Sequence, residues 1–151
     1  HAFVKTISLT YKKMPFLRIA PICNGKIYVA PRSYQGEEPG KLDIPMEDYI
    51  YACKTDTDKY AKEVENKYSN HITGQPEPRF SLKHLVKETN GVKKTIMLYI
   101  LPLNDEEQIH FTGGKFVTPE EIEMNSAQYS SFLKEEVDHL NIVAQMWEEF
   151  K

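Results

Sequence analysis

Cysteine is scarce in this sequence, and long apolar runs are missing from it. Its two cysteines, Cys23 and Cys53, lie far apart and in no spacing typical of a metal site. Such a pair gives no disulfide framework, so we expect a reducing, cytoplasmic setting. No apolar run approaches the ~18 residues that a membrane-spanning helix needs. These absences exclude a disulfide-stabilised secreted domain and predict no membrane span.

An excess of basic residues is missing as well. The 19 Lys and Arg residues are outnumbered by 22 Asp and Glu residues, which gives a net charge of −3. Lys12-Lys13 and Lys93-Lys94 are isolated pairs rather than a patch. Nucleic-acid-binding domains concentrate positive charge on one face, so we predict no nucleic-acid partner.

Several common catalytic motifs are also absent. There is no H-E-x-x-H zinc motif, no G-x-S-x-G nucleophile turn and no G-x-x-x-x-G-K-[ST] phosphate loop. The histidines do not pair at a metal-ligand spacing; they are His1, His71, His84, His110 and His139. We therefore look for function in the order of the secondary-structure elements.

The length and the apolar content of the sequence are sufficient for one folded domain. Its 151 residues are 40% apolar and 27% charged, which is an ordinary globular composition. We expect a single domain over residues 1–151. Because the chain begins with His1 rather than Met, we also expect it to be a fragment of a longer protein.

Two Asn-Gly pairs between β-prone runs are the strongest local signals. Asn-Gly suits a tight hairpin turn because both turn residues need a positive φ. Asn24-Gly25 and Asn90-Gly91 therefore predict two hairpins, and the run Thr95–Leu101 predicts a central strand buried on both faces. Val4–Tyr11 predicts a further strand before them.

Three segments have the pattern of helices. Asp58–Tyr68 follows residues that can cap a helix, and Thr118-Pro119 is a typical helix start. The segment 131–151 carries an apolar stripe and predicts a C-terminal helix. Together with the strands, this order predicts an α/β fold in which helices cover both faces of a mixed sheet.

In this order the chain resembles the Nudix hydrolase family. Four pieces carry the resemblance, in sequence order: IAPICNGKIYVAPRS, GKLDIPME, DKYAKEVENKY and GGKFVTPEEI. They look like the family's opening hairpin, the run before its catalytic loop, its catalytic helix, and a late strand and turn. The resemblance implies a Nudix-like α/β/α sandwich with a mixed β-sheet.

The resemblance also identifies the positions at which family members bind metal. The family's helix reads R-E-U-x-E-E-x-G-U (U apolar), and its glutamates hold Mg²⁺ against a diphosphate. With Val64 at the apolar position, the register gives Lys62 for the arginine, Glu63 for the first glutamate, and Asn66 and Lys67 for the other two. Upstream, Met46 and Glu47 replace two glycines.

This degenerate Nudix box predicts that the family's chemistry is lost. A Lys67 ammonium would repel a divalent cation, and Glu63, four residues earlier, suits an ion pair with it. We therefore assign no catalytic residue, no metal and no cofactor. We expect a non-catalytic nucleotide- or ligand-sensing module, or a protein-interaction module, of a larger protein.

The alternative is a divergent hydrolase of a nucleoside diphosphate derivative, which would use Glu63 and Mg²⁺. For ligand binding, the candidate residues are Arg32 and Arg79 toward phosphate, with Tyr34 and Phe80 for stacking. The expected partners are a nucleotide or another phosphate-bearing small molecule, and other domains of the parent chain.

Overall fold

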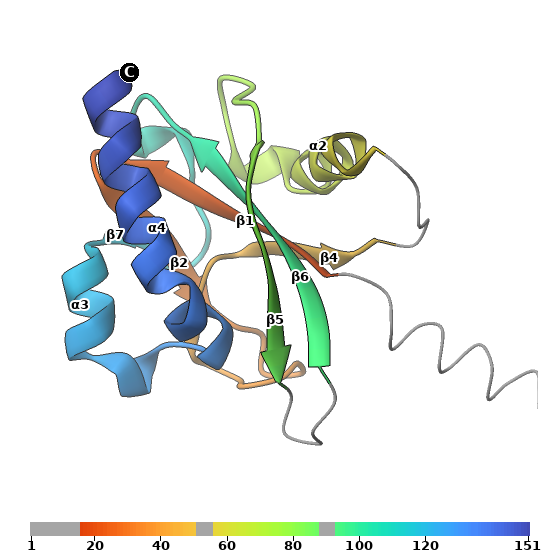
Figure 1. Cartoon of the computed structure of the whole chain (residues 1–151), viewed down its shortest axis with the longest axis vertical. Helices are drawn as coiled ribbons and strands as arrows, with labels where there is room; N and C mark the ends of the chain where they lie inside the picture. Colours follow the sequence, from red (N-terminus) through yellow and green to blue (C-terminus); the bar gives the residue numbers. More distant parts are fainter. Residues whose placement is uncertain (1–15, 51–55, 88–92) are drawn as a thin grey trace, which may run out of the picture.

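A mixed β-sheet forms the centre of the computed structural model, which describes residues 16–50, 56–87 and 93–151 (Figure 1). The described residues form a seven-stranded sheet in the order β3-β2-β1-β6-β5, with β4 paired to β1 and β7 paired to β2. Strands β1 and β6 are parallel, and the other pairs are antiparallel. The strands are β1 Phe16–Cys23, β2 Lys26–Pro31, β3 Leu42–Asp43, β4 Met46–Tyr49, β5 Arg79–Lys87, β6 Lys93–Pro102 and β7 Lys115–Val117.

The turn between β1 and β2 confirms the first predicted hairpin. Asn24 and Gly25 have φ values of 55° and 74°, which are the two positive angles that the Asn-Gly pair was expected to supply. Strands β5 and β6 also pair as an antiparallel hairpin, as predicted. The predicted strand Val4–Tyr11, the turn at Asn90-Gly91 and Cys53 lie outside the described residues.

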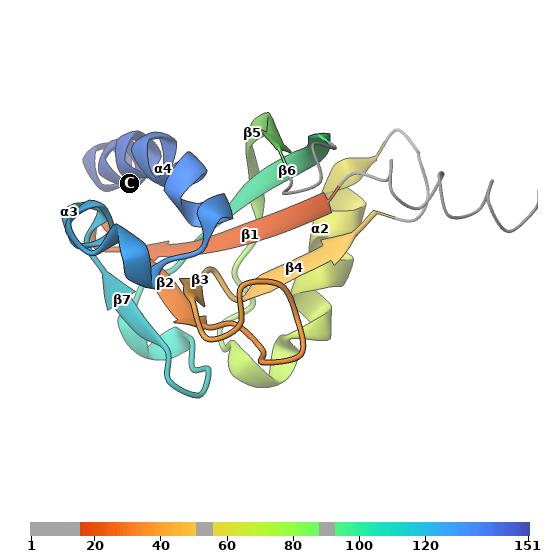
Figure 2. The same ribbon diagram turned by 90° about the horizontal axis from the view of Figure 1, so that it is seen from below.

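Helices cover both faces of this sheet (Figures 1 and 2). Helix α2 lies on one face, while α3 and α4 lie on the other. The helices are α2 Thr57–Lys67, α3 Pro119–Met124 and α4 Ser131–Phe150, with short 3₁₀ turns η1 Ser69–His71, η2 Glu106–Gln108 and η3 Ser126–Gln128. The prediction of an α/β fold with a mixed sheet between two helical layers is confirmed.

Each helix begins at a residue that satisfies one of its free amide groups. Asp56 caps α2 by accepting from the backbone N–H of Lys59, and Thr118 caps α3 by accepting from that of Glu121. Ser130 caps α4 through a 3.1 Å hydrogen bond from the backbone N–H of Leu133. The predicted helix starts at Asp56 and Thr118 are therefore confirmed, and each of the described α-helices is capped locally.

The two larger of the three buried apolar clusters among the described residues form layers on opposite sides of the sheet. Helix α2 contributes Ala61 and Val64 to one layer, and α4 contributes Leu133, Leu140 and Ala144 to the other. All eight residues of β1 are buried, because both faces of this central strand are covered. Among residues 16–50, 56–87 and 93–151, none of the helices combines the length and the hydropathy of a membrane span.

The cap of α4 gives a first testable prediction. Ser130 is fully buried, so replacing it by alanine removes an acceptor that water cannot replace. We expect Ser130→Ala to lower the free energy of unfolding by about 1–2 kcal/mol in urea titrations. The control is Ser126→Ala, at an exposed position, which should change it by less than about 0.5 kcal/mol. Equal effects of the two variants would contradict the capping role.

Candidate functional site

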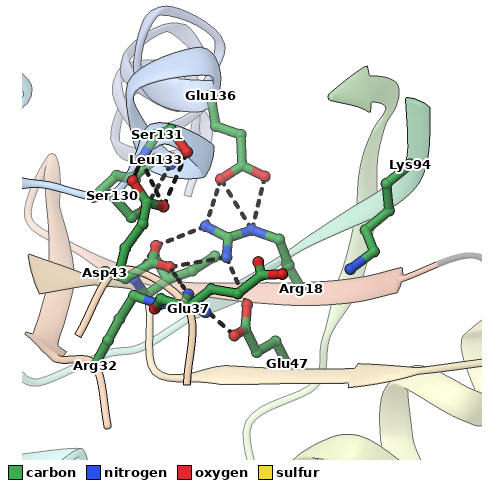
Figure 3. A network of polar contacts seen from close by, with 12 residues as sticks. Arg18, Arg32, Glu37, Asp43, Glu47, Lys94, Ser130, Ser131, Leu133 and Glu136 are labelled. Carbon is green, nitrogen blue, oxygen red and sulfur yellow. Dashed lines mark hydrogen bonds and ion pairs between the residues drawn. The ribbon is translucent and has the colours of Figure 1, made fainter. Parts of the chain in front are cut away.

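A fully buried arginine, Arg18, lies at the centre of a network of carboxylates (Figure 3). Its Nη2 lies 2.7 Å from Oδ1 of Asp43 and 2.8 Å from Oε1 of Glu136, and its Nη1 lies 2.6 Å from Oε2 of Glu47. The guanidinium also lies 5.2 Å from the ring centroid of Phe132. Burying a charge is costly unless it is paired and hydrogen-bonded, and these contacts meet that condition.

Arg18 and its three carboxylate partners come from four different elements, so their contacts connect these elements. Arg18 projects from β1, Asp43 ends β3, Glu47 lies on β4 and Glu136 lies on the core-facing side of α4. The side chain of His84 on β5 extends the network, with its Nε2 2.9 Å from Oε2 of Glu136. The network therefore links the sheet to the helical layer formed by α4.

A second arginine, Arg32, lies at the outer side of the same network. Its Nη1 is paired with Oδ2 of Asp43 and lies 3.1 Å from Oε1 of Glu47, while its Nε donates to the backbone carbonyl of Glu37. We predicted Arg32 as a phosphate contact. In the structure, two carboxylates and a carbonyl already bind these donors.

The two carboxylates between the arginines differ in proton affinity. Burial works against the charged form of Asp43, but the guanidiniums of Arg18 and Arg32 outweigh it, and the pKa of Asp43 is lowered. Burial, together with the neighbouring charge of Asp43, raises the pKa of Glu47 despite the same two arginines. Glu47 is therefore the carboxylate of the network that takes up a proton more readily than usual.

Glu47 also lies at the wall of a cavity of about 530 Å³, which we call the β4 pocket. This volume is in the range of small-molecule sites, about 300–1,000 Å³. The described residues that line it include Arg32, Asp43, Glu47 and Asp48, together with the aromatic residues Phe16, Tyr49, Tyr68, His71 and Phe111. The lining of the pocket therefore combines charged residues of both signs with aromatic residues.

Helix α2 places Lys67 next to this pocket. The Nζ of Lys67 lies 2.7 Å from Oδ2 of Asp48 on β4. Lys67 thus pairs across to the sheet, rather than along its own helix with Glu63 as we had expected. Val64, the apolar position of the register, is buried in the core, whereas the side chains of Glu63 and Asn66 are exposed.

The remaining position of the box is also occupied by an ion pair. The predicted register places Lys62 at the position of the family's arginine, and in the structure its Nζ lies 3.0 Å from Oε2 of Glu65 and 3.4 Å from the carbonyl oxygen of Pro76. Lys62 therefore joins α2 to the segment before β5, which is a structural contact.

The side chains of α2 and of the neighbouring pocket do not fit Mg²⁺. A hard divalent cation needs several oxygen ligands, but an ammonium lies against Asp48, and Asp43 and Glu47 face guanidiniums. Over residues 16–50, 56–87 and 93–151, no three His, Cys, Asp or Glu side chains are placed to hold a metal ion.

The other three candidate ligand residues lie apart from the β4 pocket. Tyr34 is 86% exposed on the loop after β2. Arg79 on β5 lies 5.3 Å from the ring centroid of Trp147, and Phe80 packs edge-on against Tyr99. Of the four predicted ligand contacts, the structure thus places only Arg32 in the wall of the pocket.

Sequence reasoning missed the residues that define the site, namely Arg18, Asp43, Glu136 and Asp48. One signal was available: Arg18 is the only charged residue in the otherwise apolar run FLRIAPIC. Glu136 lies three residues after Leu133 and four before Leu140, which puts it on the buried face of the helix. Together they indicate a buried ion pair, although not its other partners.

Comparisons with known proteins find similarity in structure but not in sequence. No family model and no curated protein sequence matches the chain. A Nudix hydrolase from Nitrosomonas europaea superposes with a TM-score of 0.61 at 11% identity, over 88% of this chain and 91% of that one. The Ap4A hydrolase of C. elegans superposes with a TM-score of 0.57 at 15% identity, over 89% of this chain and 98% of that one.

A third similar structure comes from a protein complex. The C-terminal domain of mouse MUTYH, solved with human PCNA, has a TM-score of 0.58 at 15% identity, over 88% of this chain and 90% of that one. These likenesses cover most of each chain and agree with the order of strands and helices described above. By its fold, the chain is therefore a Nudix-like domain.

Proposed function

We propose that this Nudix-like domain binds a small molecule in the β4 pocket without hydrolysing it, as a sensing module. The observation that carries the proposal is the ion pair between Lys67 Nζ and Asp48 Oδ2 at 2.7 Å. It puts a positive charge at one of the positions where the resemblance expects a metal-binding glutamate. A monovalent and a divalent cation about 4 Å apart repel each other by roughly 8 kcal/mol at an effective dielectric constant near 20.

The surroundings support binding rather than metal-dependent turnover. The carboxylates nearest to the arginines are neutralised by them, so they are not available to attract a cation such as Mg²⁺. The pocket itself has the volume of a small-molecule site and a mixed polar and aromatic wall. These features support a binding cavity, and the described residues include no carboxylate cluster that could hold a metal to activate water.

Two assays test this proposal, one of hydrolysis and one of ligand binding. The domain is incubated with Mg²⁺ or Mn²⁺ and a panel of nucleoside diphosphate derivatives, and the release of phosphate or nucleotide is followed. We expect no turnover, and we expect thermal shifts with small-molecule ligands that do not depend on the metal. Turnover that is abolished by Glu63→Gln would contradict the proposal and establish the hydrolase alternative.

A further inference from the structure

Strand β5 forms one end of the sheet, and its outer edge is open among the described residues (Figure 2). In the order β3-β2-β1-β6-β5 it pairs with β6 alone. Over residues 16–50, 56–87 and 93–151, no further backbone hydrogen bond reaches Arg79–Lys87. Alternate N–H and C=O groups of an antiparallel edge strand point away from its neighbour, so β5 presents a row of unpaired donors and acceptors.

The regular part of this edge covers residues 82–87. The register with β6 shifts between Phe80 and Leu82, which makes Ser81 the extra residue of a bulge. Beyond the bulge, six consecutive residues pair with β6 in one register. This is about the length of an ordinary strand, so the regular part is long enough for another strand to pair with it.

The two faces of β5 differ in exposure. The side chain of His84 points toward the α4 layer, where it contacts a carboxylate of that helix. Side chains alternate along a strand, so Lys83 and Leu85 point to the opposite face, and both are exposed, Leu85 by 57%. Phe80, which packs on Tyr99 of the α2 layer, is 51% exposed on that same face. Exposed apolar side chains beside an open edge are typical of a strand that pairs with another chain.

The hairpin formed by β5 and β6 is basic, although the whole chain is acidic. The strands RFSLKHLVK and KKTIMLYILP contain five Lys or Arg residues and no Asp or Glu, whereas the chain has a net charge of −3. Within the described ranges, no carboxylate forms an ion pair with Lys83. A carboxylate opposite Lys83 on an added strand would therefore supply a counter-charge that these ranges do not provide.

We propose that β5 binds an extended acidic peptide segment of another protein, which adds to the sheet as a further strand beside residues 82–87. Main-chain hydrogen bonds hold the added strand. One of its Asp or Glu residues pairs with Lys83, and an apolar residue two positions away packs on Leu85. This surface is separate from the β4 pocket, because none of the described residues that line the pocket belongs to β5.

Two other occupants fit the edge less well. A second copy of the chain has no carboxylate on its own β5, so paired β5 strands would bring lysines together without a counter-charge. A nucleic acid would contact this edge through phosphate oxygens, which only accept hydrogen bonds. It would leave the carbonyl groups of the edge and the exposed side chains of Phe80 and Leu85 unused.

The test uses a synthetic peptide of about eight residues, in which threonine fills every second position and glutamate and valine alternate at the others. A matched peptide carries lysine in place of glutamate. Binding to the isotope-labelled protein is followed by the amide NMR signals of residues 82–86. We expect the acidic peptide to shift these signals with a Kd at least about tenfold lower than that of the lysine peptide.

Methylation of the peptide's backbone nitrogens separates strand addition from attraction by charge alone. The N–H groups of an added strand point alternately toward β5 and away from it. We expect methylation at one set of alternate residues to abolish binding, and methylation at the other set to change the Kd by less than about threefold. Equal effects of the two modified peptides would overturn strand addition.

A charge reversal assigns the site to β5. Lys83→Glu, at an exposed position, should weaken binding of the acidic peptide about tenfold and strengthen binding of the lysine peptide. The matched control is Lys134→Glu, an equal change at an exposed position on α4, which should leave both Kd values nearly unchanged.

Each remaining outcome contradicts the proposal. Binding of neither peptide, an equal Kd for both, displacement of the acidic peptide by a single-stranded DNA oligonucleotide, or dimerisation of the protein alone through the same signals would overturn it. Hydrolysis and ligand binding in the β4 pocket are measured by other assays, so the two proposals can fail independently.

Discussion

Replacement of Arg18 by methionine is expected to lower the free energy of unfolding by about 3–5 kcal/mol, because removing one member of a buried ion pair leaves uncompensated charges. Glu136 is fully buried and Asp43 nearly so, and Glu47 is held by the same guanidinium. For a domain of this length, the corresponding fall in Tm is roughly 10 °C. Urea unfolding followed by circular dichroism measures the effect.

The pH dependence separates this cause from a simple loss of packing. Without Arg18, the buried carboxylates should have raised pKa values, and a group with a raised pKa contributes stability that is lost as pH rises through that pKa. The deficit of Arg18→Met should therefore shrink as the pH is lowered from 7 toward 5. A deficit that stays constant over this range would indicate that packing alone is responsible.

Two further variants serve as controls for the charge network. Arg79→Met removes an exposed arginine that packs over Trp147, and we expect a cost below about 1 kcal/mol. The double variant Arg18→Met/Glu136→Leu removes both charges of one pair, so it should be less destabilised than the sum of the single variants by at least about 1 kcal/mol. Strict additivity would show that the two side chains do not interact.

The fold could be predicted because its signals are local. Asn24-Gly25 specifies a hairpin within two residues, and Thr118 and Asp56 cap helices through contacts three residues away. The apolar residues of α4 recur with the helical period, so the side of the helix that faces the core could be predicted from the sequence. Such features need no knowledge of distant parts of the chain.

The site could not be predicted in the same way, because its contacts are distant in sequence. Arg18 pairs with Asp43 across 25 positions and with Glu136 across 118. Nothing in the local pattern around Arg18 identifies which carboxylates will meet it. The partner of Lys67 was misassigned for the same reason: Glu63 is close in sequence, whereas Asp48 reaches Lys67 only once β4 has paired with β1.

The double variant Asn66→Glu/Lys67→Glu is expected to create a Mg²⁺ site on α2, where Lys67 lies against Asp48 in the structure. The register puts Glu63 and the two new glutamates at i, i+3 and i+4, so the three carboxylates share one helix face. Loss of Lys67 also frees Asp48 as a fourth oxygen donor beside them. Without metal, this crowding of like charges at exposed positions should lower the free energy of unfolding by roughly 1 kcal/mol.

Mg²⁺ should reverse that loss in the variant alone. With a Kd on the order of 1 mM, about 10 mM Mg²⁺ stabilises the folded state by roughly 1.4 kcal/mol, or a few degrees in Tm. The natural chain should show no such shift, because the ammonium of Lys67 lies against Asp48. Asn66→Gln/Lys67→Gln is the matched control, since it removes the lysine without adding carboxylates. An equal Mg²⁺ response in that control would mean that the lysine alone excludes the metal, whereas no response in the glutamate variant would refute the register itself.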